Sequence, residues 1–387
     1  MIPWMLLPAH VRRSRLRSLL TVGSVAIAIF LFCILRSVVT GIESTVSKSS
    51  SSRVITSSAV SLFVNLPVSM WDKIRSVEGV RSTTHWTWFA GVYQDPKNFF
   101  AQFATDPASF REVYGDRHPK QAIYVLSAAE WDAFEKERTA CVVGSDLAEA
   151  YGFKVGDRIP LSGTIYPGDY EFTVRGIYTT SNNAFDKLTM FFHWNYLDEK
   201  QGNMSSVSTF TSDLASDDLA PEVATAVDAM FESSPHRCIT LTEQAFQAQF
   251  VSMWGNYTLF LSFIGGAVLV SAFMVTLNTL LLNARERVTE VGVLKTLGFP
   301  DASVGLLNLA EGVVLCGLGG LVGVGVVLAL EPALVDTLKY FVPTFEILPA
   351  TAATALGIAL GLGALSGTIP GLLAARMPVV RALRRVG

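Results

Sequence analysis

The segment RERVTEVGVLKTLGFPDASV, residues 285–304, separates two long apolar stretches and decides how the chain is organised. It contains six charged residues and a Gly-Phe-Pro sequence, whereas the flanking stretches at about 257–282 and 303–330 are almost free of charge. Each flanking stretch exceeds the roughly 20 apolar residues that cross the hydrocarbon core of a bilayer. We therefore expect a membrane protein in which a compact, mixed-charge segment connects two transmembrane helices.

The composition of the chain also points to a membrane protein. Of its 387 residues, 50% are hydrophobic and only 16% are charged, and the mean hydropathy is +0.39. A soluble domain has about a quarter of its residues charged. Residues 40–255 carry 17 Lys and Arg against 26 Asp and Glu, whereas the remainder carries 13 against 7. We therefore expect one large, acidic, soluble insert between membrane segments.

Four segments are long and apolar enough to be transmembrane helices, namely residues 19–39, 256–282, 303–330 and 349–373. In lipid, each can satisfy its own backbone hydrogen bonds as a helix. The first could instead be a cleaved signal peptide, because arginines precede it, but no small-x-small cleavage site follows Arg36. We expect an uncleaved anchor, with residues 1–18 forming an amphipathic cytoplasmic segment before it.

The distribution of Lys and Arg beside these spans predicts the orientation, since positive residues concentrate in cytoplasmic loops. They gather before the first span, in the 283–302 loop and in the 374–387 tail, whereas the 331–348 connection has only Lys339. We therefore expect both termini and the 283–302 loop in the cytoplasm, with residues 40–255 and 331–348 outside. The outer interface would hold Trp254, Tyr257, Tyr340 and Phe341.

The insert alternates helical and strand patterns, so we expect an extracytoplasmic α+β domain. Two helix–strand units are predicted to flank a small β-rich insert at about 140–180, where short β-type runs are separated by Gly and Pro. The predicted helices outside that insert are 67–79 and 221–231, and the predicted strands are 80–93, 188–194 and 237–242.

Both ends of the insert are expected to lead into membrane helices as stalks. Residues 40–52 are rich in Ser and are either a linker or an outward continuation of the first span. Residues 242–254 have a helical pattern that is predicted to run without a break into the second span.

The four cysteines allow two interpretations. Cys33 and Cys316 lie within spans and are expected only to pack. Cys141 and Cys238 lie in the outer domain, where an oxidising compartment would permit a disulfide between them. The alternative is that both are buried free thiols.

Several catalytic and binding motifs are missing from these 387 residues. There is no G-x-x-x-x-G-K-[ST], so the chain is not expected to bind ATP through a P-loop. It has no C-x-x-C, H-E-x-x-H or G-x-S-x-G, and its five histidines are scattered, so neither a metal site nor a hydrolase triad is expected. No basic patch with interleaved aromatic residues suggests nucleic acid. We therefore expect a protein that is not itself an enzyme and binds no cofactor.

The third and fourth spans are rich in glycine and contain one carboxylate. Small residues four positions apart let helices approach closely, within one chain or between two chains. Glu311 is either a functional group inside the membrane or a residue near the inner interface that hydrogen-bonds a neighbouring helix. The glycines expected to pack are Gly319, Gly320, Gly323, Gly357, Gly361, Gly363 and Gly367.

Three stretches resemble a known family. RERVTEVGVLKTLGFP (285–300) is similar to the R-x-R-E-x-G-x-L-K-A-x-G signature of the FtsX/MacB-like permeases of type VII ABC systems, with Thr296 where Ala is usual. NLAEGVVLCGLGGLVG (308–323) and PGLLAARMPVVRALR (370–384) resemble that family's third span and cytoplasmic tail. The matching residues outside the spans include Arg285, Arg287, Glu290, Gly292, Leu294, Lys295, Gly298, Arg376, Pro378 and Arg384.

The resemblance extends to the layout of one span, a large outer domain and three further spans. CVVGSDLAEAYGFKVGDRIPL (141–161) resembles the β subdomain of the MacB-type periplasmic core, and the flanking units resemble its Porter subdomain. The family implies a permease dimer above two copies of an ABC ATPase that binds ATP and Mg²⁺; no ATPase is fused here, so a separate one is expected. It also implies mechanotransmission, in which ATP-driven pairing of the ATPases moves the outer domains.

Several functions remain open within this resemblance. The MacB branch implies efflux driven with a periplasmic adaptor and an outer-membrane channel, and the Lol branch implies release of lipoproteins. An FtsX-like regulator of cell-wall hydrolases, which transports nothing, is an alternative, as is a four-span receptor without an ATPase. The size of the outer domain and its β insert favour the MacB branch, and the 283–302 segment argues against a receptor.

The opening segment is therefore interpreted as a coupling helix for the ATPase. Residues 290–297 can form about two helical turns, closed by Gly298 in a left-handed turn and by Pro300. Arg287 and Glu290 are one turn apart and could pair on the exposed side. An apolar edge for docking would consist of Val291, Leu294 and Leu297. The alternative is that this edge rests on the lipid interface.

Overall fold

The computed structural model describes residues 15–48, 50–118, 122–181, 187–253, 255–338, 342 and 344–378. The chain divides into a helical unit, Met1–Ile42 with Asn256–Gly387, and an α/β unit, Glu43–Gly255. The expected fold class, four apolar helices plus a large α/β domain, is confirmed.

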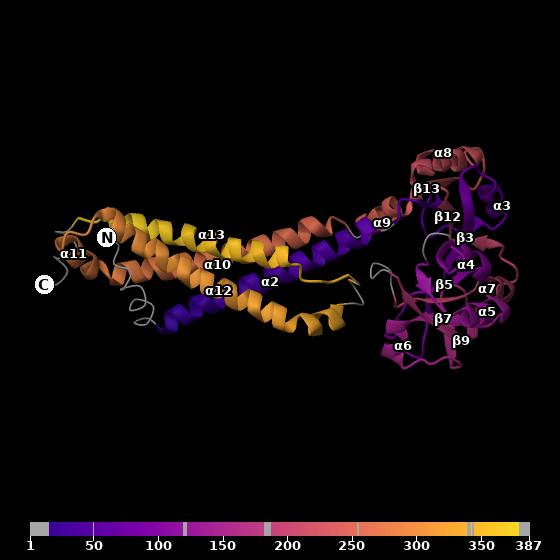
Figure 1. Cartoon of the computed structure of the whole chain (residues 1–387), viewed down its shortest axis with the longest axis horizontal. Helices are drawn as coiled ribbons and strands as arrows, with labels where there is room; N and C mark the ends of the chain where they lie inside the picture. Colours follow the sequence, from indigo (N-terminus) through magenta and orange to yellow (C-terminus); the bar gives the residue numbers. More distant parts are fainter. Residues whose placement is uncertain are drawn as a thin grey trace. The chain divides into compact units, whose positions relative to one another are not determined.

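Among the described residues, the helical unit contains four long helices and one short one (Figure 1). The long helices are long and apolar enough to cross a membrane, as predicted. Each extends beyond its apolar core, because a helix continues to satisfy backbone groups past the last apolar residue. The elements are α2 (Arg15–Lys48), α10 (Tyr257–Glu286), α11 (Val288–Thr296), α12 (Asp301–Leu338) and α13 (Pro349–Ala375).

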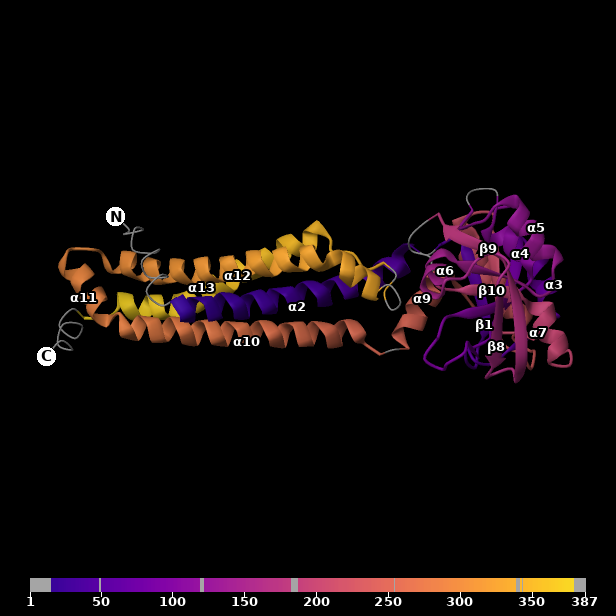
Figure 2. The same cartoon turned by 90° about the horizontal axis from the view of Figure 1, so that it is seen from below.

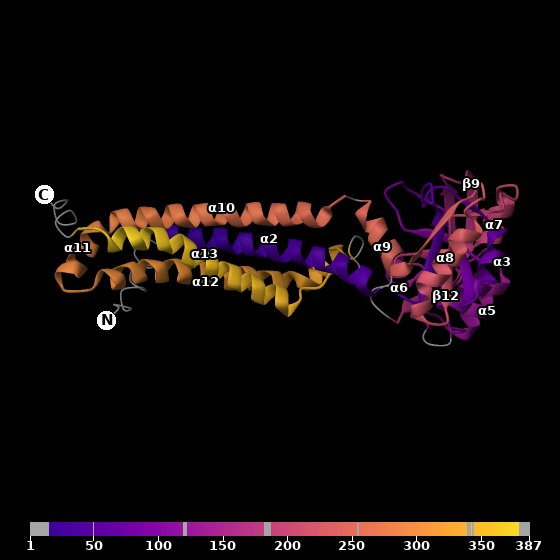
Figure 3. The ribbon, with the colours of Figure 1, turned by 90° about the horizontal axis from the view of Figure 1, so that it is seen from above.

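Helices α12 and α13 lie side by side for most of their length, and α2 and α10 run along them (Figures 2 and 3). Small residues make this approach possible, since Gly363 faces the backbone of Gly312. The buried cluster between the helices takes residues from α2, α12 and α13, and both span cysteines pack within it. Its fully buried members include Val25, Ile29, Cys33, Cys316, Val327, Ala355 and Ala359.

The α/β unit is organised around one large mixed sheet. The strand order is β13-β1-β12-β3-β5-β10-β7-β9-β8-β4, with β6 paired to β9 and a separate β2–β11 pair. The strands are β1 (Arg53–Ser58), β2 (Leu66–Pro67), β3 (Val80–Trp88), β4 (Gly91–Val92), β5 (Gln102–Thr105), β6 (Tyr124–Val125), β7 (Ala140–Gly144), β8 (Arg158–Gly163), β9 (Gly168–Thr180), β10 (Met190–His193), β11 (Ser206–Val207), β12 (Thr209–Leu214) and β13 (Cys238–Thr242).

Helices cover this sheet on both faces, and the side chains of each strand alternate between two cores. In β7, Cys141 and Val143 join one core, whereas Val142 joins the other. The helices are α3 (Met70–Arg75), α4 (Pro107–Tyr114), α5 (Ala128–Lys136), α6 (Ser145–Tyr151), α7 (Trp194–Lys200), a 3-10 turn (Asp217–Leu219), α8 (Ala220–Met230) and α9 (Glu243–Ser252).

The predicted β-rich stretch at about 140–180 contains β7, β8 and β9, and these strands are part of the main sheet. Strand β7 pairs with β10 on one side and with β9 on the other. Both β7 and β10 are buried on their two faces, and such strands lack the apolar–polar alternation that would reveal their neighbours.

The prediction that residues 242–254 continue without a break into the second span is wrong. Helix α9 ends at Ser252, and α10 begins at Tyr257. Between them, Gly255 adopts a φ of +80°, which glycine tolerates and which a helix cannot contain. Asn256 then caps α10, since its side chain accepts a hydrogen bond from the backbone N–H of Leu259 at 3.0 Å. At the other end of the insert, α2 does continue the first span, as far as Lys48.

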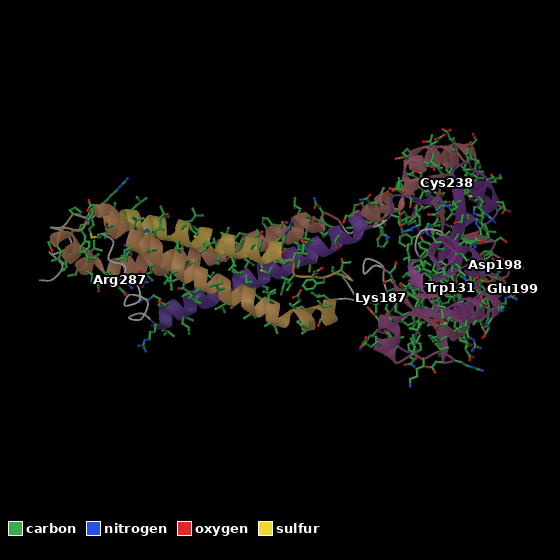
Figure 4. All side chains as sticks on the ribbon, in the orientation of Figure 1. Trp131, Lys187, Asp198, Glu199, Cys238 and Arg287 are labelled. Carbon is green, nitrogen blue, oxygen red and sulfur yellow. The ribbon has the colours of Figure 1, made fainter. Side chains whose placement is uncertain are left out.

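A disulfide between Cys141 and Cys238 is excluded, and both are buried free thiols. Cys141 lies in β7 and Cys238 lies in β13 near the top of Figure 4, at the far edge of the sheet. Six strand intervals separate the two strands, a distance of about 29 Å at the usual strand spacing. A disulfide needs Cα atoms within about 7 Å.

Candidate functional site

The short helix α11 lies at one end of the helical unit, between α10 and α12 (Figure 1). Its end is a Schellman turn, in which Phe299 N–H donates to Leu294 O and Gly298 N–H donates to Lys295 O, both at 3.1 Å. Gly298 has a φ of +86°, the conformation that this turn requires. Pro300 follows, and α12 starts at the next residue. The helix is therefore a closed element with its own end, held between two spans.

The faces of α11 differ from the expected ones. Val291 is buried with Val304 and Ala374 from α12 and α13, and Leu294 packs partly against this cluster. Val291 and Leu294 therefore bind the helix to its own spans and are not free to form the predicted docking edge, whereas Leu297, the third residue of that edge, is exposed. The exposed face consists of Thr289, Val293, Thr296 and Leu297.

Arg287 precedes α11, and its side chain points into the helical unit rather than to solvent. Its Nη1 lies 2.7 Å from Glu311 Oε2 in α12, and the two residues are 9% and 1% exposed. The expectation that Arg287 lies on the exposed side of the segment is therefore wrong, and its buried guanidinium has a buried counter-charge in Glu311. Figure 4 labels Arg287 at the α11 end of the unit.

Asn283 in α10 extends this pair into a network. Its Nδ2 donates to Glu311 Oε1 at 3.3 Å, and its Oδ1 accepts from Arg17 Nη1 of α2 at 2.8 Å. Arg17 also donates from both terminal nitrogens to Glu286 at 3.0 Å. Side chains from α2, α10 and α12 and the residue that begins α11 are thus joined. We call Arg17, Asn283, Glu286, Arg287 and Glu311 the polar network.

Glu311 therefore hydrogen-bonds neighbouring helices, which is the second of its two expected interpretations. Three members of the network, Arg17, Asn283 and Glu286, were missed by the sequence analysis. A lone amide near the end of an apolar span, as at Asn283, is the one signal that could have revealed it. Nothing local indicates that Arg17 and Glu286, 269 positions apart, would meet.

Lys295 fixes the end of α13. Its Nζ donates to the carbonyl oxygens of Ala375 at 2.7 Å and Met377 at 2.8 Å, and it pairs with Asp301 at 2.8 Å. The last carbonyls of a helix lack internal partners, so a buried cation there satisfies them and favours the helix dipole. This lysine joins α11, α12 and α13 beside a shallow groove of about 600 Å³. The groove is lined by Lys295, Gly298, Phe299, Pro300, Asp301, Ala375, Arg376, Met377 and Pro378.

The glycines of the third and fourth spans divide into two groups. Cβ atoms added at Gly319 and Gly323 would lie 2.7 Å from Val25 Cβ and 2.6 Å from Ala26 O, both in α2. Cβ atoms added at Gly320, Gly363 and Gly367 would meet the facing helix of the α12–α13 pair within 2.6–2.8 Å. These residues therefore serve packing within the chain. By contrast, Gly357 and Gly361 face open space on α13.

The remaining predicted residues lie around the same end of the unit. Arg285 is exposed, Glu290 is half-buried, and Gly292 is buried against the spans. Arg376 is the C-cap of α13. Arg384, Trp254, Tyr340 and Phe341 lie outside the described residues.

Comparison with protein-family models identifies the family of this chain. Residues 262–379 match the FtsX-like permease C-terminal family, and residues 18–230, more than half the chain, match the MacB-like periplasmic core domain. The chain belongs to the ABC transporter permeases of the FtsX/MacB type. The first match contains α11 and all of the polar network except Arg17, so the site lies in the part of the permease that defines the family.

Two relatives and one solved structure are similar to this permease or to part of it. An uncharacterized ABC transporter permease of Methanocaldococcus jannaschii is 23% identical over 97% of this permease and 96% of its own length. The macrolide export ATP-binding/permease protein MacB of Neisseria gonorrhoeae is 25% identical over 59% of this permease, which spans 36% of that relative. The periplasmic region of MacB from Actinobacillus actinomycetemcomitans aligns with 51% of this permease and 92% of that structure, at 11% identity and a TM-score of 0.37.

Proposed function

We propose that this permease couples ATP hydrolysis by a separate cytoplasmic ABC ATPase to movement of its α/β unit. One observation carries the proposal: α11 exposes Val293 and Leu297, while its other side is fixed to the spans through Val291 and through Arg287. Because the opposite side of α11 is packed against the spans, a force from the ATPase on its exposed apolar face would displace the helix without tilting it. Fixed charges in a dry site also keep their geometry under load, because moving them apart is costly.

The force applied to α11 would be transmitted through the polar network. From α11 it would reach α12 through the Arg287–Glu311 pair, and α2 through Asn283 and Arg17. Helix α2 continues without a break to Lys48, and the first strand of the α/β unit begins at Arg53. Displacement of α2 along its axis would therefore be delivered to the sheet, which is the mechanotransmission expected of this family.

The partners follow from the same proposal. The ATPase would supply ATP and Mg²⁺ binding, since these 387 residues contain no P-loop. Two ATPases would act on a permease dimer, either of two identical chains or of two related ones. The α11 end and both termini would face the cytoplasm, with the α/β unit outside the cytoplasmic membrane of a bacterial cell. In this scheme the permease has no catalytic residue of its own.

Efflux from the periplasm is the process that we favour, with a periplasmic adaptor and an outer-membrane channel as further partners. The support is the match to the MacB-like core domain and the relative that is described as a macrolide export protein. Release of lipoproteins, or regulation of a cell-wall hydrolase without transport, is the alternative. Neighbouring genes discriminate these: an ATPase gene beside adaptor and channel genes favours efflux.

The proposal is tested by purifying the full-length permease in mild detergent from its native membrane. We expect an ABC ATPase to co-purify and to be stimulated by the permease. Substitutions Val293→Ser and Leu297→Ser on the exposed face of α11 should weaken recruitment. Glu290→Arg, which adds a positive charge beside Arg287, should abolish stimulation while the chain still folds.

A matched control is Val155→Ser, which removes an exposed apolar side chain from the α/β unit, 55% exposed against 46% for Val293. It should change neither recruitment nor stimulation. If no ATPase co-purifies with the unmodified permease, the proposal fails. If the α11 variants recruit and stimulate the ATPase as well as the control does, α11 is not the docking element.

A further inference from the structure

A buried ion pair joins the two ends of the α/β unit. Arg53, the first residue of β1, donates from Nε at 2.8 Å and from Nη2 at 2.6 Å to Glu243 Oε2. Glu243 is the first residue of α9, and the same oxygen accepts the backbone N–H of Ser50 at 3.2 Å. Arg53 and Glu243 are each 5% exposed. Three donors thus converge on one buried carboxylate oxygen.

The position of this pair in the chain is its main feature. Strand β1 starts five residues after α2 ends, and α9 is the last helix before the Gly255 break and α10. Strands β1 and β13 are antiparallel, with Val54 opposite Thr242, so Arg53 and Glu243 are the next facing positions. The pair therefore lies where the two chain connections to the helical unit enter and leave the sheet.

Further charges continue the pair across the sheet. On the other side of Arg53, its cross-strand neighbour in β12 is Asp213, which is 1% exposed. Asp213 Oδ2 lies 2.5 Å from Arg81 Nη1, and Oδ1 lies 3.3 Å from His118 Nε2. Negative and positive residues therefore alternate from α9 through β1 and β12 to the Arg81 side chain at β3. We call Glu243, Arg53, Asp213 and Arg81 the charge row.

Stability alone does not account for such a row. Replacing a buried ion pair by apolar side chains of similar volume is often neutral or stabilising, because desolvation offsets the attraction. The charges instead constrain the orientation of the side chains. Arg53 must keep both donor nitrogens toward Glu243 while its guanidinium carbon lies 5.1 Å from the Tyr114 ring centre. Two apolar side chains would stay in contact if one segment slid past the other. The hydrogen bonds between Arg53 and Glu243 would not survive such a movement.

We propose that the Arg53–Glu243 pair is a clamp that makes the segment after α2 and the segment at α9 move as one body with the sheet. The inference rests on the proposed coupling function and identifies where the displacement of α2 would be transmitted to the α/β unit. Without the clamp, a displacement of α2 would move the segment after α2 relative to the segment at α9 and would not move the sheet. With it, the displacement reaches α9 and three strands, β1, β12 and β3, through the charge row.

The clamp is tested by a distance measurement that needs no ATPase. Ser47 at the end of α2 and Gln249 in α9 are exposed, and both belong to the α/β unit. Spin labels are placed on Ser47→Cys and Gln249→Cys in the full chain in nanodiscs; the four native cysteines are buried. Pulsed electron resonance should give one narrow distance distribution. It should broaden with Glu243→Gln and, to a smaller extent, with Arg53→Lys, which keeps the charge but loses the fork.

Two further variants guard against simple misfolding. The double replacement of Arg53 and Glu243 by Met removes both charges together, so the chain should retain its melting temperature while the distribution broadens. Glu171→Gln breaks an exposed ion pair with Arg158 in the same unit, 2.8 Å long, and should leave the distribution narrow. If the double variant is as narrow as the unmodified chain, the clamp does not exist.

A second readout separates this inference from the proposed function. In the complex with its ATPase, Glu243→Gln should lower permease-stimulated hydrolysis roughly tenfold, within the usual range of coupling between linked sites. ATPase recruitment should be unchanged, because α11 is intact. Broadened distances with unchanged stimulation would overturn the role of the clamp in coupling. If the unmodified permease recruits no ATPase, the proposed function fails, while the distance measurement still decides whether the clamp exists.

Discussion

The guanidinium of Arg287, one residue before the short helix α11, lies 2.7 Å from the carboxylate of Glu311, three turns into the next long helix. Both groups are buried, and Asn283 also donates a hydrogen bond to Glu311. Their contact fixes the rotation of α11 relative to α12 and leaves Val293 and Leu297 on the outside. The proposed docking face is therefore determined by a charge pair that the proposed partner would not contact.

Removing one member of this pair should destabilise the permease. Glu311→Leu leaves the Arg287 guanidinium buried without its counter-charge, at a cost of about 3 kcal/mol or more. We expect a lower melting temperature of the full chain in detergent and loss of ATPase stimulation. The double variant Arg287→Met with Glu311→Leu should recover most of the melting temperature but not the stimulation. Equal recovery of both would show that the pair serves stability only.

The two groups of glycines should respond differently to a methyl group. In Gly363→Ala, the new Cβ would lie 2.6 Å from Gly312 O and 2.7 Å from Val313 Cα, and neither backbone atom can move easily. We expect a loss of about 1–3 kcal/mol in unfolding free energy, measured by thermal unfolding in detergent. Gly361→Ala meets nothing within 4 Å and is the matched control. Equal destabilisation by the control would show that a second chain covers this part of α13.

Lys295→Met should loosen the end of α13. It removes two charge-assisted hydrogen bonds to the carbonyls of Ala375 and Met377, each worth about 1.5–3 kcal/mol. Hydrogen exchange of the backbone amides of residues 375–377 should accelerate by roughly tenfold or more. Asp301→Asn is the control, because it removes the ion pair but leaves both carbonyl bonds. Acceleration of the same size in the control would assign the effect to the ion pair.

The stability of the α/β unit should fall with acidification. His85 is buried among Trp71, Trp194 and Phe210, and burial lowers its pKa from 6.5 to about 4. Between these values the unfolded chain binds a proton that the folded chain does not, so unfolding free energy falls as pH falls from 6.5 to 4. The loss is on the order of 3 kcal/mol. Burial also lowers the pKa of His193, which adds in the same direction.

The histidine contribution is measured by chemical unfolding of the full chain between pH 4 and 7, followed by tryptophan fluorescence. His85→Gln removes the titrating group, so the dependence of unfolding free energy on pH should flatten over this interval. An unchanged slope in the variant would mean that other groups, such as the carboxyls whose pKa is lowered by Arg111, account for it.

The four long helices and the closed end of α11 could be predicted because their causes are local. A run of about 20 apolar residues can satisfy its backbone in lipid only as a helix, wherever it lies in the fold. Likewise, the Schellman turn depends on Gly298 being able to adopt a φ of +86° and on the proline after it. Neither feature needs information from a distant part of the chain.

The direction of the α11 side chains could not be predicted in the same way. Apolar residues occur on more than one face of this helix, at Val288, Val291, Val293, Leu294 and Leu297, so its periodicity does not select a buried side. The buried face is selected by Val304, Ala374 and Glu311, which belong to other helices. The same holds for β7 and β10, whose neighbours are hidden by burial on both faces.

The amino-acid sequence by itself therefore determined the four candidate spans, the position of the mixed-charge segment that forms α11, and the family. The tertiary structure alone decided which face of α11 is free, that Arg287 pairs with Glu311, and that Arg53 meets Glu243 across 190 residues. The physical reason is that local patterns set backbone conformation, whereas a charged side chain takes the partner that packing brings within reach. In a buried site without water, each charged side chain needs such a partner, because an unpaired buried charge costs too much free energy.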